Sequence, residues 1–60
     1  MTVAQALKYF GTARKVCNAL GIAEQNMTLW KNQGYIPMRR QYELEKITNG
    51  KLIAKIEDAK

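Results

Sequence analysis

Apolar residues recur every three or four positions along residues 1–20, which is the spacing of amphipathic helices. Two stripes result, one from Val3, Ala6, Leu7 and Phe10 and one from Ala13, Val16, Cys17 and Leu20. Thr2 and Thr12 each precede a stripe as N-cap residues, and Gln5 completes a capping box with Thr2. Gly11 and Gly21 follow the stripes, where glycine commonly ends a helix. The pattern therefore predicts two short helices in succession.

The stretch from Ala23 to about Asn32 has two different faces. Ala23, Met27 and Trp30 share one side at helical spacing and can close over a core. The opposite side consists of Gln25, Thr28, Leu29 and Asn32. This outer face carries no charge, whereas an ordinary solvated helix face is rich in Lys and Glu. The pattern predicts a third helix whose outer face contacts a partner.

The C-terminal third is less regular. Pro37 suits the first turn of a fourth helix, which we expect to run over about 37–49 and to bury Leu44 and Ile47. Residues 51–60 fit a helical stripe about as well as a strand that follows an Asn-Gly hairpin turn. We favour the helix and expect this segment to serve packing and dimerisation.

Positive charge is concentrated in the first two-thirds of the chain. The chain contains ten Lys and Arg residues and five Asp and Glu residues, which gives a formal net charge of +5. Residues 1–42 contain six of the basic residues and a single acidic one, Glu24, whereas the charges of residues 43–60 sum to zero. Such a surface favours a polyanion as partner.

The composition argues against several function classes. No apolar run approaches the roughly 18 residues of a transmembrane helix, and the first residues do not resemble a signal peptide, so we expect a cytoplasmic protein. The chain has no histidine, and Cys17 is its only cysteine, so no metal site is expected. On a buried stripe the Cys17 thiol is expected to be inert. The sequence shows no nucleophile–base pair and no glycine-rich phosphate loop, so we expect neither an enzyme nor a cofactor or small-molecule ligand.

The second and third predicted helices, with the turn between them, have the layout of a helix-turn-helix at about 12–32. Cys17 falls where the helices cross and the side chain must be small, and Gly21 can supply the positive φ of the turn. An apolar wedge is expected to fix the angle between the helices, formed by Val16, Leu20, Ile22, Met27 and Trp30. The helix at about 24–32 can then enter a DNA major groove. The expected fold is all-α, a single domain over 1–60 built as a compact bundle of about five short helices.

Two stretches of the chain are together similar to one protein family. The first runs from Phe10 to Ile22 and continues with Trp30 and Lys31, and the second comprises Ile36, Pro37, Tyr42, Leu44, Glu45, Thr48, Gly50 and Leu52. In this combination the chain resembles the Cro-type repressors of lambdoid bacteriophages, in their mainly helical branch. The resemblance implies a helical repressor of a near-palindromic operator in phage or prophage DNA. Ala23 departs from the family pattern, where serine is frequent, and removes a capping hydroxyl.

Four residues of the third helix are candidates for contacts with bases. The Gln25 amide can form a bidentate pair with the N6 and N7 edge of adenine. Thr28 and Leu29 can pack on thymine methyl groups, and Glu24 can accept from a cytosine amino group. The alternative for each is an ordinary surface residue.

Phosphate contacts are expected from polar and basic residues around that helix. The candidates are Thr12, Arg14, Lys15, Lys31, Asn32, Arg39 and Arg40. Such contacts fix the register on the duplex and supply salt-sensitive affinity without reading sequence. Trp30 can stack on bases in principle, but its spacing from Met27 predicts a core position.

One helix reads only a few base pairs, so we expect a homodimer on double-stranded DNA, formed on the DNA if not before. Its contacts are expected within 35–60. One alternative is a winged-helix excisionase or a protein like the mercury-resistance regulators, because the run 28–37 resembles the end of their recognition helix and predicts a β-hairpin over 33–40. An alternative from another functional class is a protein-interaction adaptor or antirepressor, which would bind a partner protein through the face formed by Gln25, Thr28 and Leu29.

Overall fold

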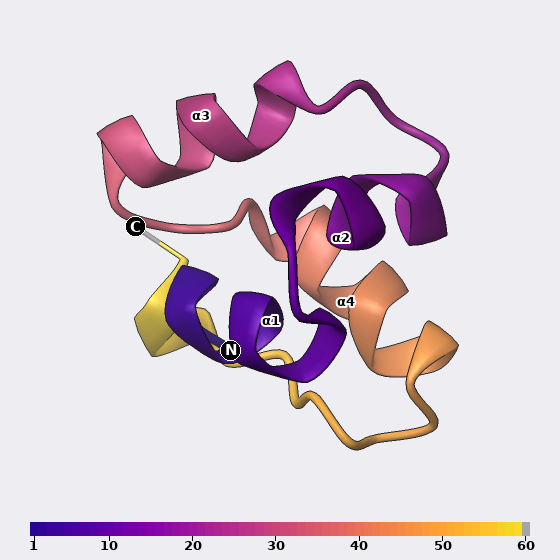
Figure 1. Cartoon of the computed structure of the whole chain (residues 1–60). Coiled ribbons are helices and arrows are strands. Elements are labelled where there is room, and N and C mark those ends of the chain that lie inside the picture. Colours follow the sequence, from indigo (N-terminus) through magenta and orange to yellow (C-terminus); the bar gives the residue numbers. More distant parts are fainter. Residues whose placement is uncertain (60) are drawn as a thin grey trace.

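The computed structural model of the chain describes residues 1–59 (Figure 1). Its elements are α1 (Val3–Phe10), α2 (Ala13–Leu20), α3 (Gln25–Gln33), α4 (Met38–Ile47) and the short 3-10 helix η1 (Ile56–Asp58). No strand occurs within these 59 residues. The expected all-α fold is confirmed, with four α-helices rather than about five. None of the helices in this part of the chain is long and apolar enough to cross a membrane.

The first two helices begin and end as their sequence predicts. The Gln5 N–H donates to the Thr2 hydroxyl at 3.1 Å, and the Thr2 N–H donates back to Gln5 Oε1 at 2.8 Å. The Thr12 hydroxyl accepts from the Lys15 N–H at 3.2 Å. Gly21 closes α2 with φ of 70°, in the left-handed region that favours glycine. These caps satisfy backbone donors and acceptors that short helices otherwise leave free.

α2 is the central helix of the bundle. It packs against α3 on one side and against α1 and α4 on the other (Figure 1). The core comprises Met1, Ala6, Val16, Cys17, Met27, Trp30, Ile36, Leu44 and Leu52. Trp30 is 1% exposed, so the indole is a core group as its spacing predicted. The core thus fixes the position of α3 from its inner side.

The winged-helix alternative is wrong. A wing requires a β-hairpin over 33–40, but α3 extends to Gln33 and α4 begins at Met38. Pro37 stands immediately before α4, where its fixed φ suits the start of a helix. The short connection between α3 and α4 leaves no room for two paired strands.

The C-terminal segment departs from both expectations for it. α4 ends at Ile47 rather than near residue 49, Ile47 is 47% exposed instead of buried, and Thr48 is buried in its place. Residues 51–55 form neither helix nor strand, and only η1 is helical; Lys60 lies outside the described residues. The chain reverses at Asn49 and Gly50, whose φ angles are 53° and 83°.

Side chains of α4 explain why residues 51–55 do not form a helix. The Ala54 N–H donates to Glu45 Oε1 at 2.8 Å, and the Lys55 N–H donates to Gln41 Oε1 at 3.0 Å. The Leu52 N–H donates to the Thr48 hydroxyl at 3.1 Å. Because side chains of α4 and of its C-cap Thr48 accept these backbone N–H groups, the segment is satisfied without secondary structure of its own.

Gln41 is the polar centre of the molecule. Its side chain is fully buried, and its Nε2 donates to the Ile36 carbonyl at 2.9 Å. Its Oε1 accepts from the Met1 amino group at 2.8 Å as well as from the Lys55 N–H. The Met1 nitrogen also pairs with Asp58 at 3.2 Å. One amide therefore connects the first residue, the α3–α4 connection and the C-terminal segment.

Candidate nucleic-acid interface

The turn between α2 and α3 holds the two helices in a helix-turn-helix. The Gly21 N–H donates to the Asn18 carbonyl at 3.1 Å, and the Ile22 N–H donates to the Cys17 carbonyl at 3.0 Å. A Cβ added at Gly21 would have no atom within 4 Å, so the positive φ and not crowding requires glycine here. The expected function of Gly21 is confirmed.

Cys17 lies where α2 meets α3. Burial raises the pKa of its thiol, the Glu24 carboxylate adds to this effect, and a hydrogen bond with the Met27 backbone opposes it. Cys17 and Met27 are both buried in the core, so this small residue is enclosed between the two helices. Because a raised pKa keeps the thiol protonated at neutral pH, Cys17 is suited to packing rather than to redox chemistry.

The two faces of α3 are separated as the sequence predicts, with one exception: Ala23, expected on the inner side, precedes the helix and is exposed. Met27 and Trp30 are buried, each 1% exposed, whereas the side chains of the opposite face are exposed. That outer face consists of Gln25, Thr28, Leu29 and Asn32. Leu29 is 56% exposed, so a large aliphatic group on this face faces the solvent. The buried inner side fixes the orientation of α3, so that its uncharged outer side faces the solvent.

Internal hydrogen bonds distinguish the amides of α3 from one another. Asn26 Nδ2 donates to the Ala23 carbonyl at 3.0 Å, and Gln33 Nε2 donates to the Tyr35 carbonyl at 2.9 Å. The amides of Gln25 and Asn32 make no such bond within residues 1–59 and remain available to a ligand. The sequence pattern does not predict the bond of Asn26. This bond stabilises the first turn of α3, whose N-cap residue makes no side-chain hydrogen bond.

A hollow brings several candidate residues together. It lies between the start of α2 and the first turns of α3, and it is lined by Ala13, Glu24, Gln25, Met27, Thr28 and Lys31. Three of the four proposed base-contacting residues therefore lie on one surface, next to a proposed phosphate contact. Leu29 and Asn32 are outside this hollow, on the exposed face of the same helix.

The remaining candidates for phosphate contacts differ in their exposure and in whether they already have a partner within the protein. Arg14, Lys15 and Arg39 are exposed. Arg40 is partly buried and forms an ion pair with Glu43 at 2.8 Å, one α4 turn away. The Thr12 hydroxyl is already engaged in capping α2. A phosphate contact by Arg40 or Thr12 would therefore compete with, or be shared with, an existing bond.

Comparison with known proteins gives one match. A family model described as "DNA-binding transcriptional regulator Cro" matches residues 2–60. No curated protein and no solved structure matches the chain. The matched range contains both helices of the helix-turn-helix as well as α4 and the segment that follows it.

Proposed function

Because the chain belongs to the Cro family of DNA-binding transcriptional regulators, we propose that it reads a specific sequence of double-stranded DNA with α3 in the major groove. The observation that carries this proposal is the uncharged, exposed face of α3, held outward by buried Met27 and Trp30. A major groove admits a helix, and short polar side chains on such a face can meet base edges. The fold supports this use, since α3 stands at the outside of the bundle (Figure 1).

Base recognition is assigned to the first turns of α3. The free amide of Gln25 suits adenine, and Thr28 beside it suits a thymine methyl or a base-edge hydrogen bond. Exposed Leu29 offers an apolar contact to a second thymine methyl. Glu24 accepts from a cytosine amino group and disfavours other bases at its position, because a carboxylate near phosphates needs such a donor.

Phosphate contacts are assigned to the residues that surround this face. They are Thr12, Arg14, Lys15, Lys31, Asn32, Arg39 and Arg40. Exposed Arg14, Lys15, Lys31 and Arg39 are expected to contribute most, because no internal partner within residues 1–59 competes for them. Arg40 is expected to contribute less, because Glu43 already neutralises it.

The proposed active form is a homodimer on a near-palindromic operator. A single α3 reads too few base pairs to select one site in a genome, whereas two copies double the readout. Exposed apolar side chains within 35–60 can supply the contacts between copies, among them Tyr42, Ile47 and Ile56, the last of which is 74% exposed. These contacts are expected to form on the DNA if not before.

The proposed outcome is repression. Occupation of a promoter by the dimer would block RNA polymerase, as the resemblance to phage repressors implies. The proposed setting is the DNA of a phage or prophage in a bacterial cell.

Selection of binding sites from random duplexes, repeated at two salt concentrations, tests the proposal. We expect an enriched inverted repeat and an affinity that falls steeply with salt. Enrichment of a single site without an inverted repeat would contradict only the proposed dimer and not the sequence-specific binding. An absence of any enriched sequence would contradict sequence-specific reading, and binding without a salt slope would favour an adaptor function for the α3 face.

A further inference from the structure

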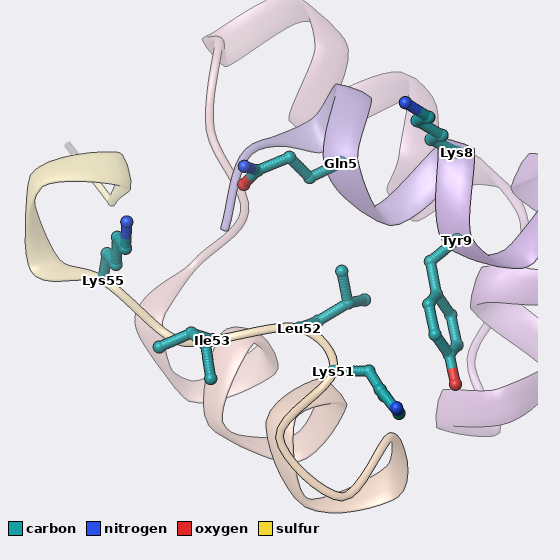
Figure 2. A pocket seen from close by; sticks show the side chains of 7 residues that line it. All are labelled: Gln5, Lys8, Tyr9, Lys51, Leu52, Ile53 and Lys55. Carbon is teal, nitrogen blue, oxygen red and sulfur yellow. The ribbon is translucent and has the colours of Figure 1, made fainter.

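A second surface feature lies away from α3. A groove of about 580 Å³ runs between α1 and the irregular segment that follows α4 (Figure 2). Gln5, Lys8 and Tyr9 line it from α1, and Lys51, Leu52, Ile53 and Lys55 line it from the segment. We refer to the surface formed by these seven residues as the lysine groove. Its volume is in the range of clefts that accommodate ligands.

The lysine groove combines positive charge with exposed apolar surface. Three of its residues are lysines, and no carboxylate of residues 1–59 lines it. Tyr9 is 49% exposed and Ile53 is 48% exposed, while Leu52 is buried beneath them. Figure 2 shows the Tyr9 ring extending from α1 toward the segment that carries Lys51. A complementary ligand therefore needs negative charges together with an apolar side chain.

We propose that the lysine groove binds an acidic segment of a partner protein, in which carboxylates flank an aliphatic or aromatic side chain. The carboxylates would pair with Lys8, Lys51 and Lys55. The apolar side chain would cover Tyr9 and Ile53. Charge complementarity of this kind steers association and excludes basic partners.

The groove is separate from the proposed DNA contacts. No residue of α2 or α3 lines the groove, which lies on the other side of the bundle from the outer face of α3, so a duplex bound by that face leaves the groove open (Figure 1). Ile53 also argues against a second site for a DNA duplex, because the phosphodiester backbone of a duplex offers no apolar group to cover it. The regulator can accordingly hold DNA and an acidic protein segment on opposite sides.

A second copy of this chain does not supply the required ligand. Glu43 is paired with Arg40, the Glu45 carboxylate accepts from Ala54, and Asp58 pairs with the Met1 amino group. Glu24 belongs to the proposed DNA face. Glu57 is exposed, but it is one carboxylate, and three lysines require more than one. Among residues 1–59, a neighbouring copy therefore offers only Glu57 as an exposed carboxylate that is neither paired nor part of the proposed DNA face.

Titration of the isotope-labelled full chain with a synthetic peptide tests the proposal. The peptide alternates glutamate with leucine and phenylalanine, and its counterpart carries glutamine in place of glutamate. We expect amide chemical shifts to change for α1 and residues 51–55 but not for α3, with the acidic peptide only. The double variant Lys8→Glu/Lys51→Glu should weaken binding about tenfold or more, because it reverses two contacts with carboxylates.

Lys46→Glu is the matched control, since Lys46 is exposed on α4 and does not line the groove. It should leave peptide affinity within about twofold, since the exposed charge it reverses lies outside the groove lining and is screened by salt. Equal weakening by Lys46→Glu, shifts centred on α3, or equal binding of the glutamine peptide would each overturn the proposal. Tighter binding of single-stranded oligouridine at the same residues would overturn it in favour of a nucleic-acid site. Concentration-dependent shifts of Lys8 and Tyr9 in the absence of peptide, on the α1 wall that lies outside the proposed dimer contacts, would overturn it in favour of self-association.

Discussion

At the scale of single residues, α3 separates amides that serve the fold from amides that are free. Gln25 and Gln33 are both exposed on this helix, but the Gln33 amide is bonded to the Tyr35 carbonyl. The Gln25 amide lines the hollow with Thr28 and Lys31. Chemically identical side chains on one helix therefore have different capacities to bind a ligand.

Gln25→Ala is expected to relax sequence preference at one base position in each half-site. Loss of the bidentate contact removes about 1–3 kcal/mol of discrimination at that position. Site selection with the variant measures the effect. Gln33→Ala is the control and should preserve the wild-type preference; a preference that Gln25→Ala leaves unchanged would remove Gln25 from the base-reading residues.

Arg39 and Arg40 allow a second comparison between identical side chains. Arg39→Ala should weaken all duplexes about equally and lower the slope of log affinity against log salt by about one, because a phosphate contact reads no sequence. Arg40→Ala should change both quantities less, because Glu43 already pairs with Arg40. Affinity measured over a salt series decides this. A base-selective effect of Arg39→Ala would show that Arg39 contacts a base.

At the scale of elements, two threonines of the helix-turn-helix have different functions, one in helix stability and one in the proposed DNA contact. Thr12 caps α2 through its hydroxyl, whereas Thr28 lies on the outer face of α3 without such a bond in the described chain. The same substitution at these two positions should therefore have different consequences.

Thr12→Ala should lower the free energy of unfolding by about 1 kcal/mol, the usual cost of a lost N-cap. Thr28→Ala should leave the stability nearly unchanged and alter DNA sequence preference instead. Chemical denaturation of both variants, together with site selection, separates the two effects. Equal destabilisation by Thr28→Ala would mean that its hydroxyl supports the fold.

The elements that sequence predicts well are those whose determinants are local. The caps at Thr2 and Thr12, the left-handed Gly21 and the inner stripe of α3 each depend on residues within one or two helical turns. The inward Met27 and Trp30 then fix which face of α3 is exposed, so the candidate interface also follows from local spacing. The base and phosphate contacts themselves stay predictions.

The C-terminal segment could not be predicted in this way. Its conformation depends on the bond of Lys55 to Gln41 and on that of Ala54 to Glu45, across 14 and nine positions. A periodic apolar pattern contains no information on such pairs. For the same reason, the lysine groove has no sequence signal, because α1 and residues 51–55 meet only in the folded chain.

At the scale of the whole molecule, Gln41 holds together segments that are distant in sequence. Its amide contacts the Met1 amino group, the Ile36 carbonyl and the Lys55 N–H, all in or near the core. The apolar core of so small a protein is thin. The position of the C-terminal segment, and with it one wall of the lysine groove, therefore depends on one buried side chain.

Gln41→Ala should lower the free energy of unfolding by at least about 2 kcal/mol, because it leaves several buried donors and acceptors without partners. A chain of this size has only a few kcal/mol of stability in total, so the variant should unfold at a clearly lower denaturant concentration. Gln33→Ala removes an exposed amide and should change the stability by less than about 0.5 kcal/mol. Amide exchange of the surviving folded fraction should also become faster at Lys55 before it does in α2, since the segment loses its anchor first. Equal stability of the two variants would mean that apolar packing of Leu44 and Leu52, rather than the buried amide, holds the C-terminal segment in place.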